Sequence, residues 1–125
     1  MSPDERDSRV LLGPLGPLVR LGVSSTLSMD GSVEIVGDED ETDAAVSAAG
    51  ELAPDVIILG GDPRGAKALS DRLRAAAPTA TLIFCPSDER IEVLDPGTST
   101  IRRCPATAAD GLRLELSRRH DNAQE

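Results

Sequence analysis

Short aliphatic runs alternate with amphipathic stretches along most of the chain, and this alternation predicts its organisation. The clearest run extends from Val56 to Leu59, after Pro54 and Asp55 and before a Gly-Gly pair. An uninterrupted, β-branched run of this kind is typical of a strand buried on both faces, as in parallel sheets covered by helices. The residues after Leu59, beginning with Gly60, should therefore lie at the carboxyl end of a central strand, where open α/β sheets place their ligand sites.

More strands and a series of helices are predicted on either side of this run. The other strands are expected at residues 9–12, 33–36, 81–85 and 100–103. Helices are expected at residues 17–28, 42–52 and 64–77, in a shortened form from Ser87 to about Leu94, and after Thr107. Apolar residues recur at helical spacing in the longer stretches, Pro17 suits a first helical turn, and Thr42 or Asp43 can cap the second helix.

The order of these elements predicts the fold class. Five strand-then-helix units in 125 residues indicate a single α/β domain. Right-handed crossovers leave few topologies, and the commonest at this length is a doubly wound, parallel, five-stranded sheet in the order 2-1-3-4-5. We expect a disordered start at residues 1–8, the domain at residues 9–117, and a polar tail or the start of a linker at residues 118–125.

Composition narrows the possible functions. Phe84 is the only aromatic residue and the formal net charge is −9, so the domain alone has neither stacking platforms nor the positive charge that nucleic acids require. No apolar run approaches the roughly 20 residues of a membrane span, and the polar first residues lack a signal-peptide core. A soluble, cytoplasmic protein is the expectation.

Acids and cysteines give no strong sign of a metal or cofactor. The acids from Asp38 to Asp43 fit a solvated loop that enters a helix better than a metal site. Cys85 and Cys104 end neighbouring predicted strands and could form a redox pair. Alternatively they are two small buried thiols, which an intracellular location favours.

Several short segments share a pattern with one bacterial family. They are 10–12, 17–22, 36–37, 54–59, 73–78 and the pair Cys104-Pro105. In their order and spacing they resemble the receiver domains of response regulators, especially those fused to LuxR-type helix-turn-helix domains. The resemblance implies the CheY-like receiver fold, a role in two-component signalling and transcription regulation, and DNA binding only through a helix-turn-helix domain outside these 125 residues.

The same resemblance implies reactive positions that this chain does not fill. Receivers use two acids after strand one to hold Mg²⁺, a phosphoacceptor aspartate at the end of strand three, a hydroxyl residue at the end of strand four and a lysine after strand five. The residues here are Pro14 and Leu15, Gly60, Pro86 (followed by Ser87) and Cys104. Phosphoryl transfer to a protein needs a nucleophile and a cation that holds the oxygens, so we expect no phosphorylation, no bound metal and no catalysis.

These altered positions should surround one depression, which is a candidate ligand pocket. Its residues are Gly13, Pro14, Leu15, Gly60, Gly61, Ser87, Cys104 and Pro105. One hypothesis is a small-molecule site in place of the acid pocket. The other is that Pro14 and Leu15 fill the depression by packing, and it is favoured because no cluster of polar groups is left to orient a ligand.

Self-association is a further hypothesis. Leu21 stands where the family usually has a charged, solvent-facing residue, so we expect a homodimer through the first and last helices. The expected dimer face consists of Leu18, Leu21, Leu112 and Leu116. Alternatively, Leu21 is an ordinary exposed apolar residue.

The sequence thus predicts a phosphorylation-independent, receiver-like regulatory domain of a transcription regulator, acting as a homodimerisation and small-molecule-sensing module. The alternative is a stand-alone interaction protein that docks on a kinase or a regulator. An enzyme fits least, because the site lacks a base, a metal set and an activated nucleophile.

Overall fold

The computed structural model describes residues 8–14, 21–25, 33–60, 67–85, 91–95 and 101–103. Residues 21–25 form a helical segment between the first two strands. The other elements are β1 (Ser8–Leu12), β2 (Val33–Asp38), α2 (Thr42–Leu52), β3 (Val56–Gly60), α3 (Lys67–Ala76), β4 (Thr81–Cys85), β5 (Glu92–Leu94) and β6 (Ile101–Arg103).

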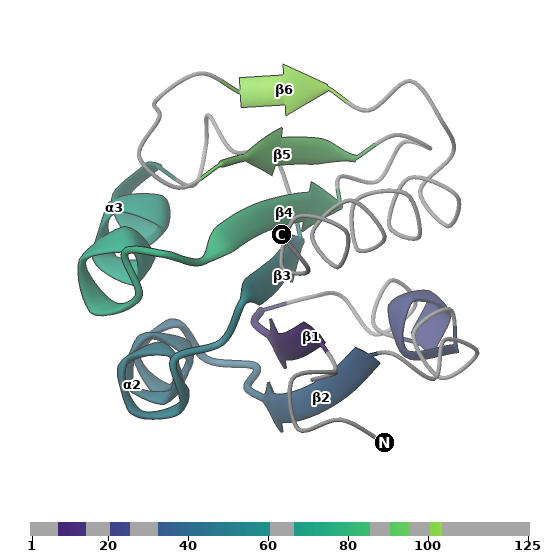
Figure 1. Cartoon of the computed structure of the whole chain (residues 1–125), viewed down its shortest axis with the longest axis horizontal. Helices are drawn as coiled ribbons and strands as arrows, with labels where there is room; N and C mark the ends of the chain where they lie inside the picture. Colours follow the sequence, from purple (N-terminus) through teal and green to yellow (C-terminus); the bar gives the residue numbers. More distant parts are fainter. Residues whose placement is uncertain are drawn as a thin grey trace, which may run out of the picture.

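These strands form one sheet in the order β2-β1-β3-β4-β5-β6, with α2 and α3 on one face and the helical segment on the other (Figure 1). Neighbours among the first four strands in this order are parallel. All five predicted strands are present and keep the predicted order, so the doubly wound α/β fold is confirmed.

The region after β4 differs from the prediction. A shortened helix was expected to reach Leu94, but residues 92–94 form β5, which runs antiparallel to both β4 and β6. The sheet therefore has six strands, and the predicted fifth strand lies one position further out. Ile91 and Val93 are fully buried and Glu92 and Leu94 nearly so, which suits a strand inside a sheet better than a helix with one solvent face.

The last predicted helix, with Leu112 and Leu116, lies outside the described residues.

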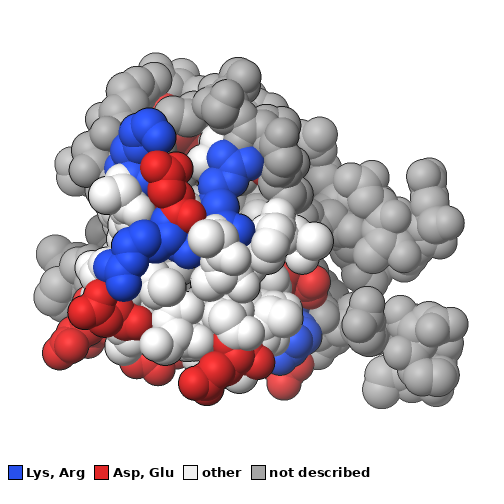
Figure 2. Space-filling model, turned by 90° about the vertical axis from the view of Figure 1, so that its left-hand side faces the viewer, with Lys and Arg blue, Asp and Glu red and all other residues white. Residues whose placement is uncertain are grey.

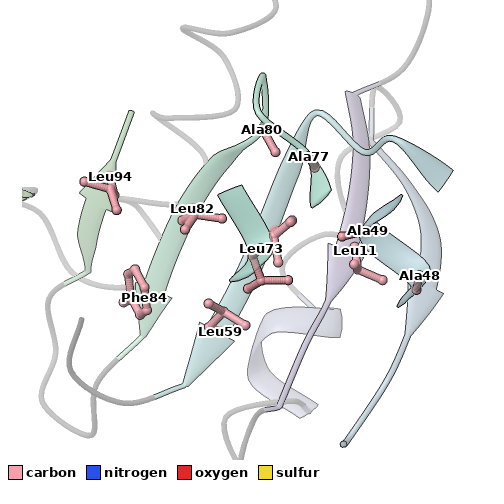
Figure 3. Packing of buried hydrophobic residues seen from close by; sticks show 11 residues of the cluster. Leu11, Ala48, Ala49, Leu59, Leu73, Ala77, Ala80, Leu82, Phe84 and Leu94 are labelled. Atoms are coloured by element: carbon pink, nitrogen blue, oxygen red, sulfur yellow. The ribbon is translucent and has the colours of Figure 1, made fainter. Parts of the chain in front are cut away.

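Two apolar layers cover the sheet because successive strand side chains point to opposite faces. Leu11, Ile57 and Phe84 belong to the layer under α2 and α3, where Leu73 of α3 is fully buried (Figure 3). Val10, Leu12, Ile58 and Ile83 face the other way, and Val23 of the helical segment packs in their cluster. Full burial of such a side chain contributes about 1.5–3 kcal/mol to the free energy of folding. The two layers therefore hold α2 and α3 on one face of the sheet and the helical segment on the other.

Helix α2 spans the predicted residues, but its cap differs from the prediction. The N-cap is Glu41, with no side-chain hydrogen bond to the helix, rather than Thr42 or Asp43. Asp43 instead lies in the first turn, where the helix dipole favours a negative charge. At the other end Ala53 adopts a left-handed conformation (φ 48°, ψ 58°), and its N–H donates to the Ala49 carbonyl.

Asp55 joins the amino ends of three strands. Its carboxylate accepts a hydrogen bond from the Arg9 N–H (2.9 Å), and its own N–H donates to the Arg9 carbonyl (2.8 Å). Its carbonyl accepts from the Thr81 N–H (3.0 Å). The residue that precedes the central strand therefore sets the register of β1, β3 and β4 at the edge opposite the candidate site.

The left-handed conformation of Ala53 leads to a stability prediction. Glycine adopts this conformation without the Cβ penalty, so Ala53→Gly should raise the free energy of unfolding by about 1 kcal/mol. The matched control is Ala75→Gly at an exposed position within α3, where the same change should lower it by a similar amount. Urea unfolding of both variants measures the two signs, and a destabilised Ala53→Gly variant would contradict the prediction.

Candidate functional site

The candidate site lies where the central strands end. Gly13 and Pro14 follow β1, Gly60 ends β3 and Cys85 ends β4, with Gly60 and Cys85 paired across the ladder. Because β1, β3 and β4 are parallel and adjacent, these residues share one edge of the sheet. The structure thus brings together the three described pocket residues, and it adds Cys85 beside them. The sequence is consistent with Cys85 as half of a redox pair or as a buried thiol, and the structure shows it buried. The predicted pocket does not include Cys85, although its place as the last residue of a predicted strand was the available signal.

Backbone hydrogen bonds close the space between β1 and β3. The Gly13 N–H donates to the Ile58 carbonyl at 2.8 Å, and the Gly60 N–H donates to the Pro14 carbonyl at 2.9 Å. The chain after β1 therefore continues to pair with β3 beyond the last residue of the strand. Pro14 and Gly60 are both half-buried, so this contact forms the rim of the site.

The Leu59 side chain fills the space next to Gly13. A Cβ atom on Gly13 would overlap the Cδ2 atom of Leu59, whose side chain is 1% exposed. Glycine is thus required at position 13 by packing against β3. On the other side of the loop, the Glu39 N–H donates to the Leu12 carbonyl at 2.8 Å, which extends the pairing to the end of β2.

The described residues at the ends of β1, β3 and β4 carry no ionised side chain at neutral pH, although Asp38 and Glu39 stand at the neighbouring end of β2. Gly13, Pro14 and Gly60 have no ionisable side chain, and burial raises the pKa of the Cys85 thiol to about 12. The thiol is therefore a poor nucleophile and metal ligand at neutral pH. Within the described ranges, no group of three His, Cys, Asp or Glu side chains could hold a metal ion.

The remaining predicted site residues cannot be placed. Leu15, Gly61, Ser87, Cys104 and Pro105 of the pocket lie outside the described residues, as do Leu18, Leu112 and Leu116 of the expected dimer face. Cys104, the predicted redox partner of Cys85, is among these residues.

Leu21 is the one member of the expected dimer face that is described. It is 66% exposed on the helical segment 21–25, which contains no charged residue. Ile35 of β2 is the other large apolar residue that is exposed in the described part of the chain. Ile35 pairs with Val10, which faces the layer containing Val23, so Ile35 lies on the same side of the sheet as the helical segment.

The chain was compared with known proteins. No family model matches it. It is 34% identical over 93 residues to the probable transcriptional regulatory protein NarL of two Mycobacterium tuberculosis strains, CDC 1551 and H37Rv. That match covers 70% of this chain and 42% of the NarL protein.

Two solved structures share the arrangement of strands and helices. The response regulator RcsB in its DNA complex aligns with a TM-score of 0.56 at 19% identity, over 66% of this chain and 44% of RcsB. The isolated REC domain of RcsB from Salmonella enterica serovar Typhimurium, in the presence of BeF₃⁻, aligns with a TM-score of 0.56 at 17% identity, over 90% of this chain and 73% of that domain. The chain has the fold of a response-regulator receiver domain.

The receiver fold accounts for only part of the curated relatives, since the chain spans about two fifths of their length. The resemblance to receiver domains implies an acid pocket at the carboxyl ends of β1 and β3. In this chain those ends carry Pro14 and Gly60, which are joined by a backbone hydrogen bond. No helix in the described part of this receiver fold is long and apolar enough to cross a bilayer.

The packing at Gly13 leads to a second prediction. Gly13→Ala should lower the free energy of unfolding by about 1–3 kcal/mol, because the methyl group must displace the buried Leu59 side chain. Gly22→Ala is the control, since Gly22 is exposed in the helical segment and its Cβ would meet no atom within 4 Å. Urea unfolding of both variants tests this. Equal stability of the two variants would mean that the loop after β1 is not held against β3.

The burial of Cys85 leads to a third prediction. At pH 8 the native protein should not react with iodoacetamide at Cys85, whereas the urea-unfolded protein should, as measured by peptide mass mapping. The unfolded thiol ionises near its ordinary pKa of 9.0 and the folded one only near 12, so unfolding releases a proton above pH 9. The stability due to the neutral thiol is fully present below pH 9.0 and is lost as the pH rises towards 12. The Cys85→Ala variant should not lose this stability at alkaline pH. Rapid alkylation of Cys85 in the native protein would contradict the burial of the thiol.

Proposed function

We propose that the chain is a receiver-like regulatory domain of a transcription regulator that works without phosphorylation. The observation that carries this proposal is the Gly60 N–H bonded to the Pro14 carbonyl, at the site where the resemblance requires a phosphoacceptor carboxylate and metal-binding acids. In this proposal residues 9–117 form the regulatory domain, and residues 1–8 and 118–125 lie outside it.

The chemistry of acyl-phosphate formation supports the proposal. A carboxylate must attack the phosphorus while a divalent cation holds the equatorial oxygens. Gly60 has no side chain, Pro14 is a hydrophobic residue without a ligand atom in its side chain, and the Pro14 carbonyl already accepts a hydrogen bond. The Cys85 thiol beside Gly60 stays protonated at neutral pH. Gly13, Pro14, Gly60 and Cys85 thus supply neither a carboxylate nucleophile nor a carboxylate ligand for a cation at the ends of β1, β3 and β4.

The closed rim also bears on small-molecule sensing. Gly13, Pro14 and Gly60 offer a ligand at these strand ends no polar side chain, and the Leu59 side chain, which is almost fully buried, fills the space next to Gly13. We therefore favour a plugged site, with the domain acting chiefly as a homodimerisation module through Leu18, Leu21, Leu112 and Leu116. The exposure of Leu21 on an uncharged helical segment supports that face.

The relatives supply the regulatory context of this proposal. NarL is described as a transcriptional regulatory protein, and RcsB as a two-component response regulator solved with DNA. DNA contact by this protein would then belong to a separate helix-turn-helix domain, because the described receiver fold resembles only part of those proteins. The alternative is a stand-alone partner that docks on a kinase or regulator.

A phosphorylation assay tests the proposal. The chain is incubated with acetyl phosphate and Mg²⁺ beside a phosphorylatable receiver as a positive control, and intact masses are measured. We expect no gain in mass for this chain, because the nucleophile and cation site are missing. A gain of one phosphoryl group on this chain, at a rate comparable to that of the control, would overturn the proposal. Peptide mapping would then identify the acceptor.

A further inference from the structure

The face formed by α2 and α3 carries separated charges. Helix α3 has three bases, Lys67, Arg72 and Arg74, and one acid, Asp71, for a net charge of +2. Helix α2 has two acids, Asp43 and Glu51, and no base, for a net charge of −2. Figure 2 shows this face, with most blue side chains over its upper part, red side chains along its lower rim, and some acids and bases side by side. The two adjacent helices thus carry equal and opposite charges.

These charges are accessible to another molecule. The Lys67 and Asp43 side chains are 78% and 88% exposed, and those of Asp71 and Arg72 are 62% and 49% exposed. Within the chain, Lys67 pairs with Asp71 at 3.0 Å and Arg72 pairs with Asp43 at 2.8 Å. Exposed pairs of this kind contribute little to stability, so exchanging an internal partner for one on another molecule costs little.

The centre of the face permits close approach. Beside the Asp43–Arg72 pair, which joins the two helices, the exposed residues Ser47 and Gly50 of α2 and Ala75 of α3 are small and uncharged. The helices themselves lie close together, since a Cβ on Gly50 would be 3.8 Å from the Ala76 Cβ. The short side chains leave the longer charged ones around them accessible to an opposing surface.

We propose that this face binds the same face of a second copy of the chain. A two-fold axis that runs between α2 and α3 and parallel to them places α2 of each copy over α3 of the other. Each net −2 helix then meets a net +2 helix, twice in one interface, as an isologous contact requires. The proposal concerns the face opposite the helical segment that carries Leu21, and it does not rest on the proposed function.

Charge argues for a second copy over other partners. The acids of α2 repel a uniformly acidic partner, and the bases of α3 repel a uniformly basic one. The net charge of −9 also opposes the association of two copies, so the local charges of this face have to carry the recognition. A partner surface is complementary to the whole face when it places positive charge opposite α2 and negative charge opposite α3. A two-fold rotation of this face produces such a surface. If the Leu21 face also dimerises, two different two-fold contacts on opposite sides of the sheet build an open chain of molecules.

A charge-swap experiment tests the interface, in a Leu21→Glu background that removes the other proposed face. One variant reverses α3 with Lys67→Glu and Arg72→Glu, and the other reverses α2 with Asp43→Lys and Glu51→Lys. Each alone should self-associate about ten-fold or more weakly than the background, because like charges then face each other. An equimolar mixture should restore dimers, and native mass spectrometry should identify them as heterodimers by mass. Far-UV circular dichroism checks that each variant is folded.

The control is Glu34→Lys with Asp38→Lys on β2, which changes the net charge as much as the α2 reversal does but leaves α2 and α3 unchanged. The control should associate as the background does. The interface is overturned if the Leu21→Glu background is monomeric throughout, or if the two reversed variants each associate like the background, or if their mixture forms no heterodimer. If Leu21→Glu has the same oligomeric state as the wild type, the proposed Leu21 face is contradicted instead. The results for the two proposed interfaces can therefore be told apart.

Discussion

The pairing of β1 with β3 beyond the end of the ladder is the constraint on which the site depends. Two hydrogen bonds, from Gly13 to Ile58 and from Gly60 to Pro14, hold the loop after β1 against the central strand. That contact leaves no room for a Cβ at position 13, because Leu59 occupies the space. The chemistry between the ends of β1 and β3 is therefore set by backbone groups and a packed side chain rather than by ionisable ones.

The added strand β5 changes the other half of the sheet. Two antiparallel pairings replace the single parallel pairing of β4 with the last strand that the sequence analysis predicts, so β6 becomes the far edge. A hydrogen bond from Arg74 of α3 to the Asp95 carbonyl (3.3 Å) joins the end of β5 to the helix layer. The candidate site lies at the carboxyl ends of β1 and β3, whereas β5 and β6 lie on the other side of β3, beyond β4, whose last residue Cys85 pairs with Gly60.

The two faces of the sheet differ in the chemistry of their exposed residues. The helical segment presents Leu21 without any charge, whereas α2 and α3 present paired charges of opposite sign. Apolar contacts add affinity by area, and charge patterns add orientation and discrimination between partners. The molecule thus offers two physically different surfaces for assembly, and their strengths should respond to salt in different ways.

Five strands, predicted from residues 9–12 to 100–103, and the lack of ionisable groups at Pro14 and Gly60 could be read from the sequence, because buried runs and missing side chains are local properties. The order of these strands followed from the few topologies that right-handed crossovers allow. That residues 92–94 form a strand depends on tertiary structure, since a short apolar run has no period of its own and pairing with β4 selects its conformation. The same holds for the Glu41 cap, for Cys85 beside Gly60 and for the Pro14–Gly60 bond. Each depends on register and backbone direction, which arise only when distant segments pack together.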